Sequence, residues 1–239
     1  MRAIVLTGAG SAFCAGADLA RDTEDQTLAD PADPFASTRD ETSFSASPIQ
    51  PAAFELRTPV IAAVNGPAIG IGLTIALQAD IRVFAEDAKC GVVQARRGVI
   101  GDCMSHWTLP RLAGMAAAAD ILLTGRTFRG AEAVQLGLAT RALPAAHVLS
   151  HALDIARDIA ENVAPMSAAL SKRLLWDTAI KGYTPRQVAS LETQLHRLLM
   201  GSDDAREGVA AFLGRRTPRW SSSVAKDDQT KPQETCRER

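Results

Sequence analysis

The stretch that decides the fold runs Pro59-Val-Ile-Ala-Ala-Val-Asn-Gly-Pro-Ala-Ile-Gly-Ile-Gly72. Its continuous apolar run from Val60 to Val64 is typical of a buried strand, and the turn dipeptide Asn65-Gly66 closes it. The apolar residues from Ala68 to Ala79 predict a buried helix, and Ile81 to Ala85 predicts the next strand. A strand, a turn, a helix and a strand in this order indicate an α/β fold.

A second glycine-rich turn lies near the start of the chain, in Gly8-Ala-Gly-Ser-Ala-Phe-Cys-Ala-Gly-Ala-Asp18. The run from Ala3 to Leu6 predicts a buried strand that leads into it. Small residues let a ligand approach the backbone, and free N–H groups at a helix start bind negative charge. Phe13 stands where a dinucleotide fingerprint needs its third glycine, so that motif is excluded. Either turn alone is typical of tight packing, whereas the two together favour a ligand site.

The composition of the 239-residue chain is that of an ordinary globular protein, with 46% hydrophobic and 22% charged residues. Its net charge of −1 argues against a nucleic-acid partner. No apolar stretch is long enough to cross a membrane and the N-terminus lacks the features of a signal peptide, so we expect a cytoplasmic protein with no membrane partner. We expect reduced, mostly buried thiols and no metal site, because the cysteines are far apart: Cys14, Cys90, Cys103 and Cys236.

The second half of the sequence predicts four helices. Apolar residues recur at helical spacing from Leu149 to Val163, and the segment from Pro165 to Gly182 has proline first and glycine last. Ser202 is expected to cap the last helix, with acidic residues in its first turn and Arg215 and Arg216 in its last turn. The third helix opens at Thr184-Pro185, and its apolar residues are predicted to face inward: Val188, Leu191, Leu195, Leu198 and Leu199.

Two polar segments show no periodicity. Residues 21–50 are rich in Asp, Glu, Ser, Thr and Pro, which predicts an irregular surface segment. After Trp220 the chain has almost no apolar residues, so residues 221–239 are expected to form a disordered tail.

Asp102 is the acid that stands out, in Gly98-Val-Ile-Gly-Asp-Cys-Met-Ser105. It lies at a predicted helix start, where an N-cap and a catalytic acid are equally compatible with the sequence. An acid among apolar and small residues suits a proton shuttle. The sequence contains neither the nucleophile elbow of a hydrolase nor the paired-histidine motif of a zinc protease.

The two glycine turns carry a family resemblance. The segment Arg2-Ala-Ile-Val-Leu-Thr-Gly-Ala-Gly-Ser-Ala-Phe-Cys-Ala-Gly-Ala-Asp-Leu19 resembles the first signature of the enoyl-CoA hydratase/isomerase (crotonase) superfamily, and residues 59–72 resemble its second. The likeness extends to about residue 220, through these shorter matches: Arg97-Gly-Val, Leu109-Pro-Arg-Leu, Leu123-Thr-Gly-Arg, Ala133-Val-Gln-Leu-Gly-Leu138, Glu207-Gly-Val-Ala-Ala-Phe and Arg215-Arg-Thr-Pro218.

The resemblance implies an α/β fold in which residues 1–145 form a spiral of ββα turns and residues 146–220 form a helical region that builds homotrimers or hexamers. It implies an enzyme whose substrate is an acyl-CoA or enoyl-CoA thioester, with coenzyme A as part of the substrate and no separate cofactor. Members have strands and a helix before the first signature, whereas this chain begins inside that signature's strand. We therefore expect a truncated or misassigned start, or a decayed paralogue.

By motif position, the resemblance makes the backbone N–H groups of Ala17 and Ile71 the pair that holds the thioester oxygen. Two such donors stabilise the enolate that forms when a proton leaves C2. Glycine usually stands in the family where this chain has Ile71. The same positions imply further substrate-binding residues: Ala15, Asp18, Leu19, Pro67, Gly70, Gly72, Gln94 and Lys172. For Lys172, which would meet a CoA phosphate, a solvated lysine is the alternative.

The chain departs from the family at the two glutamates that activate water in hydratases. Thr74 and Gln94 stand at those places, and neither is a general base. Asp102 occupies the place of the single acid that Δ3,Δ2-enoyl-CoA isomerases use. The resemblance therefore favours isomerase chemistry, with hydration, hydrolysis or decarboxylation of a thioester as alternatives. A non-catalytic acyl-CoA-binding subunit is the alternative from a different class.

Overall fold

The computed structural model describes residues 1–16 and 45–224. These residues belong to two compact units. The first unit consists of Val5–Ala53 and Val60–Leu153, and the second of Met1–Ile4, Phe54–Pro59 and Asp154–Arg239. The predicted boundaries at residues 145 and 220 stay a prediction. Ala17, Asp18, Leu19, Cys236 and most of the segment 21–50 lie outside the described residues.

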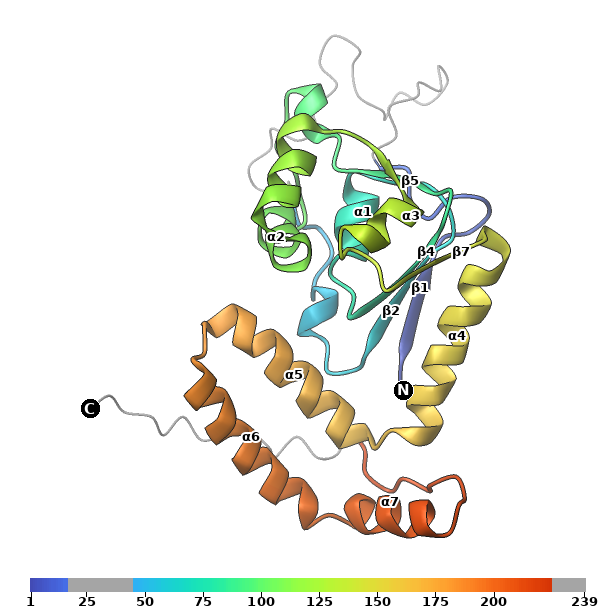
Figure 1. The fold of residues 1–239 in the computed structure, drawn as a ribbon, viewed down its shortest axis with the longest axis vertical. Helices are drawn as coiled ribbons and strands as arrows, with labels where there is room; N and C mark the ends of the chain where they lie inside the picture. The colour runs from blue at the N-terminus through green and yellow to red at the C-terminus, as the bar shows by residue number, and fades with distance from the viewer. Residues whose placement is uncertain (17–44, 225–239) are drawn as a thin grey trace, which may run out of the picture. The chain divides into compact units, whose positions relative to one another are not determined.

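The first unit contains a sheet with the strand order β1-β2-β4-β7 (Figure 1). β2 (Val60–Val64) is completely buried and pairs in parallel with β4 (Ile81–Ala85), which in turn pairs in parallel with β7 (Arg141–Leu143). Both apolar runs are therefore strands, as predicted. The expectation of a buried first strand was wrong, because β1 (Ile4–Thr7) lies at the sheet edge, where Leu6 and Thr7 are exposed.

A second, smaller sheet makes the architecture a spiral. β3 (Ala68–Ile69) pairs in parallel with β5 (Lys89–Gly91), which pairs antiparallel with β6 (Phe128–Arg129). The chain therefore places one strand in the first sheet, the next in the second sheet and then a helix. It does so twice, as β2-β3-α1 and as β4-β5-α2, with α1 at Ile71–Ala76 and α2 at Ser105–Thr124. This repetition confirms the expected fold of ββα turns.

The interior of the first unit lies between the sheets and their helices. α3 (Gly130–Gln135) packs against β4 and β7, and α1 packs against β3. α2 is kinked at Gly114, whose backbone leaves the helical region (φ 77°, ψ 163°). Short 3-10 turns lie at Ala53–Glu55 and Gln94–Arg97. The largest fully buried side chains include Phe84, Ile61, Leu73 and Leu77.

The segment from Ala68 to Ala79 is not one helix, which corrects the prediction. Gly70 (φ 57°, ψ −123°) turns the chain between β3 and α1, and its N–H donates to the carbonyl oxygen of Gly91 at 2.8 Å. A side chain at residue 70 would strain this backbone conformation. The apolar run thus divides into a strand and a short helix, which hydrophobic content alone does not reveal.

Four helices form the C-terminal part of the described chain. They are α4 (Ala145–Asn162), α5 (Pro165–Lys181), α6 (Pro185–Met200) and α7 (Asp203–Leu213), drawn in yellow to red in Figure 1. The first of them, α4, contains the division between the two units at Leu153 and Asp154, and the other three belong to the second unit. As predicted, α5 begins with proline and ends at Gly182, which has a left-handed backbone. Ser202 caps α7, because its hydroxyl accepts from the N–H of Ala205 at 3.1 Å.

Two predictions for the last helices were wrong. Arg215 and Arg216 lie beyond α7, because the helix ends at Leu213 and Arg215 turns left-handed (φ 50°). The apolar face of α6 does not point into a core, since no residue of that helix is buried and Leu198 is 49% exposed. The helices therefore leave apolar surface uncovered in the single chain.

The start of the expected disordered tail also needs correction, because Ser221 and Ser222 are held by Asp204. The Ser221 N–H donates to the Asp204 Oδ1 at 2.7 Å, and both hydroxyls donate to the same carboxylate. Burial opposes ionisation of Asp204, yet these hydrogen bonds outweigh it and lower the pKa of that carboxyl. Residues 225–239 lie outside the described part of the chain.

Gly72→Ala tests the packing that positions α1. A Cβ at residue 72 would lie 2.3 Å from the carbonyl oxygen of Cys14, which is far inside van der Waals contact. Overpacking of this kind typically lowers the free energy of unfolding by about 1–3 kcal/mol. Chemical denaturation measures the change.

Gly201→Ala is the matched control, because its Cβ would meet nothing closer than 3.7 Å and its backbone is right-handed helical. There we expect a gain of about 0.4–1 kcal/mol from the stiffer unfolded chain. Equal effects of the two substitutions would contradict the close approach of Gly72 to Cys14.

Candidate active site

The two glycine turns lie against each other in the first unit. The side chain of Asn65 joins them, because its Oδ1 accepts from the N–H of Gly8 at 3.0 Å and its Nδ2 donates to the carbonyl oxygen of Gly10 at 3.0 Å. The N–H groups of Phe13 and Cys14 both donate to the carbonyl oxygen of Pro67. The two turns are therefore in direct backbone contact.

The first turn of α1 presents a free backbone donor. Ile71 follows Gly70 directly, and among the described residues nothing accepts a hydrogen bond from its N–H. The Ile71 side chain is half-buried, whereas Gly72 is buried against Cys14. A ligand oxygen is the kind of acceptor that this N–H can take.

Asp102 lies beside the same helix. Its Oδ1 accepts a hydrogen bond from the Oγ1 of Thr74 at 2.6 Å, and its carboxylate is half-buried. The side chain caps no helix, because α2 begins at Ser105 and its N-cap residue is Met104. Of the two interpretations left open by the sequence, the structure therefore excludes the N-cap.

A strained turn holds Asp102 in place. The next two residues, Cys103 (φ 43°) and Met104 (φ 61°), both have left-handed backbones, a conformation that is uncommon for residues with side chains. The buried amide of Gln78 donates to the carbonyl oxygen of Cys103 at 3.1 Å, and the N–H of Cys103 donates to the carbonyl oxygen of Ala46 at 2.9 Å. Strain of this kind persists where the surroundings fix the backbone, and such positions cluster at functional sites.

The cysteines of the described region are free thiols. Cys90 and Cys103 are buried, as expected, whereas Cys14 is half-buried. Burial raises the pKa of the Cys90 thiol to about 12. Burial also raises the pKa of the Cys103 thiol, and the charge of Asp102 adds to that effect. Neither buried thiol is suited to act as a nucleophile, because the thiolate is the reactive form.

Gln94 borders the turn that begins α1. A Cβ built on Gly70 would lie 3.4 Å from the Gln94 Nε2, so the amide borders that glycine. The Gln94 Oε1 is buried and, among the described residues, has no hydrogen-bond donor. A buried acceptor without a partner is costly, so a water molecule or a ligand group is the natural donor here.

The sequence-predicted site residues thus divide into three sets. Those in the first unit gather around the two glycine turns and the start of α1: Ala15, Pro67, Gly70, Ile71, Gly72, Gln94 and Asp102. Ala17, Asp18 and Leu19 lie outside the described residues, so their roles stay predictions. The third set is Lys172, which belongs to the second unit.

Lys172 is buried rather than solvated, which corrects the alternative considered for it. Its Nζ donates to the carbonyl oxygen of Thr58 at 2.9 Å. This hydrogen bond joins Lys172 to another residue of the second unit. A contact between Lys172 and a CoA phosphate stays a prediction, and the burial of the side chain does not favour it.

Sequence reasoning missed the bond between Thr74 and Asp102. Thr74 was noted only as a residue that is not a glutamate, although a hydroxyl in an otherwise apolar, buried segment needs a partner. That need was the available signal. Its partner, which is 28 positions away in the chain, is visible only in the fold.

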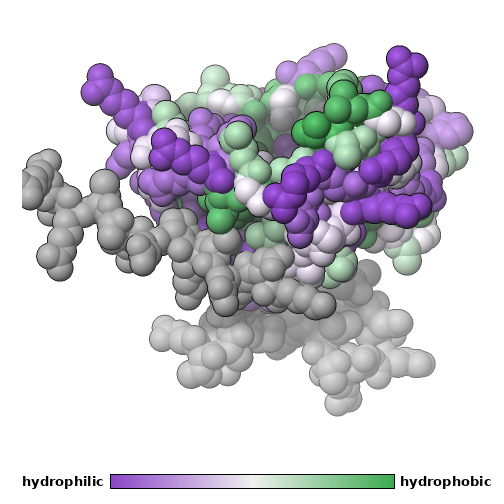
Figure 2. Space-filling model, turned by 90° about the horizontal axis from the view of Figure 1, so that it is seen from below, coloured by the Kyte–Doolittle hydropathy of each residue, from purple (hydrophilic) through white to green (hydrophobic). Residues whose placement is uncertain are grey.

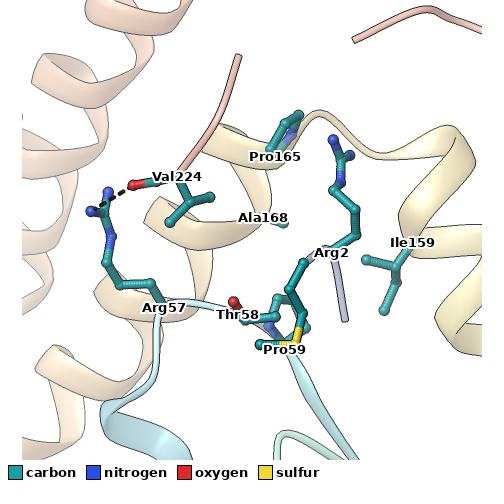
Figure 3. Close-up of a pocket in the computed structure, with 9 residues that line it drawn as sticks. Arg2, Arg57, Thr58, Pro59, Ile159, Pro165, Ala168 and Val224 are labelled. Atoms are coloured by element: carbon teal, nitrogen blue, oxygen red, sulfur yellow. Dashed lines mark hydrogen bonds between the residues drawn. The ribbon is translucent and has the colours of Figure 1, made fainter. Parts of the chain in front are cut away.

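A small cavity in the second unit does not serve as a substrate site (Figure 3). Arg2, Arg57 and Ile159 are among the residues that line it, and the Arg57 Nη1 donates to the carbonyl oxygen of Val224 at 3.1 Å. Its volume is about 10 Å³, which is room for one water molecule.

Within residues 1–16 and 45–224, no cluster of three or more His, Cys, Asp or Glu side chains is arranged to hold a metal ion. A search of the same part of the chain finds no helix with the length and apolar character needed to cross a membrane.

The fold is a spiral of ββα turns, in which the Ile71 N–H has no acceptor among the described residues and lies on the same helix as Thr74, the partner of Asp102. These features are typical of α/β enzymes of the crotonase type. The chain belongs to the enoyl-CoA hydratase/isomerase family, whose sequence profile matches residues 1–223. It is 34% identical over 221 residues to the 1,2-epoxyphenylacetyl-CoA isomerase of Escherichia coli K12, covering 92% of this chain and 81% of that protein.

Other relatives carry the hydratase name. The chain is 35% identical over 220 residues to a probable enoyl-CoA hydratase of Rhodobacter capsulatus, covering 92% of this chain and 81% of that protein. The crystal structure of a probable enoyl-CoA hydratase/isomerase from Mycobacterium abscessus superposes with a TM-score of 0.82 at 55% identity, over 93% of this chain and 82% of that one.

Proposed function

We propose that this enzyme isomerises enoyl-CoA thioesters by moving one proton between C2 and C4 with Asp102 as the acid and base. The carboxylate of Asp102 takes the C2 proton, the electron pair passes to the thioester oxygen as an enolate, and the same proton returns at C4. The observation that carries the proposal is an acid at residue 102 held beside the start of α1 by Thr74. Its carboxyl is the only acidic side chain among the predicted site residues that the structure describes.

In this proposal the enolate oxygen lies between the N–H groups of Ala17 and Ile71. The free N–H of Ile71 supports the assignment of one donor. A preorganised donor of this kind typically lowers the activation barrier by about 3 kcal/mol. Coenzyme A is part of the substrate, and the mechanism needs no separate cofactor.

Isomerisation is preferred over hydration because of the residues at positions 74 and 94. Family hydratases are expected to activate water with two glutamates, whereas Thr74 and Gln94 stand at those places and neither side chain is a base near neutral pH. Asp102 is then a single acid, which suffices to move a proton between C2 and C4. The relatives named above include a probable hydratase, an isomerase and a probable hydratase/isomerase, so the preference rests on the residues of this chain.

The substitution Asp102→Asn tests the proposal. The amide is similar in size but cannot accept the C2 proton, so turnover of a 3-enoyl-CoA should fall by about 10²- to 10⁴-fold. Absorbance of the conjugated thioester measures the product, and calorimetry with a saturated acyl-CoA should give unchanged binding. Asp154→Asn is the matched control, because Asp154 is an exposed acid on α4 paired with Arg157.

Retained turnover in Asp102→Asn would remove this residue from the mechanism. A folded wild-type protein that binds acyl-CoA without turning over any enoyl-CoA would instead support the non-catalytic subunit.

We further infer that three or six copies of the chain assemble through the C-terminal helices. α7 exposes three large hydrophobic side chains at helical spacing, Val209, Phe212 and Leu213, with Phe212 82% exposed. Figure 2 shows one face of the molecule on which strongly hydrophobic surface, in green, lies among hydrophilic surface, in purple. Exposed apolar patches of this kind are typical of protein–protein contacts.

Phe212→Asp tests the assembly. A carboxylate at the centre of an apolar contact should dissociate the oligomer, because burying an unpaired charge is unfavourable. Light scattering coupled to size-exclusion chromatography should show a multiple of three chains for the wild type and smaller species for Phe212→Asp. Ser150→Asp, an equal charge change at an exposed position of α4, should keep the wild-type mass. A monomeric wild type would contradict the inference.

A further inference from the structure

The hydroxyl of Thr74 has two oxygen acceptors within reach and only one hydrogen to donate. Its Oγ1 lies 2.6 Å from the Asp102 Oδ1 and 3.1 Å from the carbonyl oxygen of Ile71. Thr74 is completely buried, so water cannot supply an alternative partner. The hydrogen therefore goes to one of these two oxygens at a time, and the Cys103 sulfur, which also lies within hydrogen-bonding reach of Thr74, is a weaker acceptor than either.

The charge of Asp102 decides between the two acceptors. A hydrogen bond to an ionised carboxylate is shorter and about twice as strong as one to a neutral carbonyl. While Asp102 is a carboxylate, Thr74 donates to its Oδ1, and the Oδ2 has no donor among the described residues. The free oxygen is then the one available to take a proton.

The preferred acceptor of the Thr74 hydroxyl changes once Asp102 carries a proton. The acid is then neutral, the advantage of its oxygen over the Ile71 carbonyl disappears, and Thr74 can donate to Ile71 instead. A buried hydroxyl that has an acceptor in both states avoids the cost of an unsatisfied donor during the reaction cycle. A side chain without a hydroxyl offers Asp102 no such partner.

We propose that Thr74 is a positioning residue that holds the Asp102 carboxylate through its Oδ1 and transfers its hydrogen bond to the Ile71 carbonyl when Asp102 is protonated. The inference rests on the proposed function, in which Asp102 moves the proton. Thr74 itself touches no reacting atom. Its contribution is to fix which carboxylate oxygen faces the substrate and to remain hydrogen-bonded in both states of the acid.

Thr74→Val and Thr74→Ser separate the hydroxyl from the shape of the side chain. Valine keeps the volume and β-branching of threonine but removes the hydroxyl, so kcat with a 3-enoyl-CoA should fall about 10- to 100-fold while KM changes little. Serine keeps the hydroxyl and should stay within about threefold of the wild-type kcat. Thermal unfolding establishes that each variant folds, and Thr74→Ala supplies a second protein without the hydroxyl.

A double-mutant cycle with Asp102→Asn tests whether Thr74 acts through Asp102. If it does, Thr74→Val should cause no further loss in the Asp102→Asn protein, because the carboxylate it positions is already gone. The proposal is overturned by a Thr74→Val enzyme with the wild-type kcat, by an equal loss in Thr74→Ser, or by the same loss in both backgrounds.

A crystal structure of Thr74→Val tests the positioning without any assay. We expect the Asp102 carboxylate to leave the orientation it has in the wild type, and to keep that orientation in Thr74→Ser. An unmoved carboxylate in Thr74→Val contradicts the role of Thr74. A moved carboxylate together with an active Asp102→Asn enzyme would instead refute the proposed function while leaving the positioning intact.

Discussion

The close backbone contact between residues 8–14 and 65–72 is the constraint on which the site depends. A Cβ at Gly66 would lie 2.0 Å from the carbonyl oxygen of Ser11, and one at Gly72 would lie 2.3 Å from that of Cys14. Only glycine fits at such distances. Because these two positions lack side chains, the first turn of α1 sits directly against the N-terminal segment. The N–H of Ile71 and the hydroxyl of Thr74 both belong to that helix, so the position of the helix fixes theirs.

Asp102 does not belong to α1 but to the turn that precedes α2, and the backbone conformation of that turn has an energetic cost. Cys103 and Met104 adopt left-handed backbones, which typically costs on the order of 1–3 kcal/mol for each residue. The buried Gln78 stabilises the turn from the side of α1 through the Cys103 carbonyl, and Thr74 bonds the acid itself. Thr74 on α1 and Gln78, two residues beyond the end of α1, thus both bond to the Asp102 turn. Gln94, whose Oε1 has no hydrogen-bond donor among the described residues, is a further polar group that borders Gly70 at the start of α1.

Much of the fold could be predicted from hydrophobic patterning and cap residues. β2 and β4 follow from continuous apolar runs, and α5 follows from its proline and glycine boundaries. Patterning failed where tertiary contacts override local preference, as at Gly70, which divides one apolar run into β3 and α1. It failed again at α6. Helical spacing identifies the apolar face of that helix, but it does not show whether any other part of the chain covers that face. For the site, motif positions singled out Asp102 as a candidate. The sequence indicated that the Thr74 hydroxyl needs a partner, but it could not identify Asp102 as that partner, because the contact joins segments 28 positions apart.

The central claim is that one acid moves one proton and that no water adds to the substrate. Isotope labelling tests this directly. A 3-enoyl-CoA deuterated at C2 is converted in water that contains no deuterium but is enriched in oxygen-18, and the product is analysed by mass spectrometry and NMR. Part of the deuterium should appear at C4, because Asp102 returns the hydrogen it removed, and no oxygen-18 should enter the acyl chain. Oxygen-18 at C3 would contradict it, since that result requires a base that activates water.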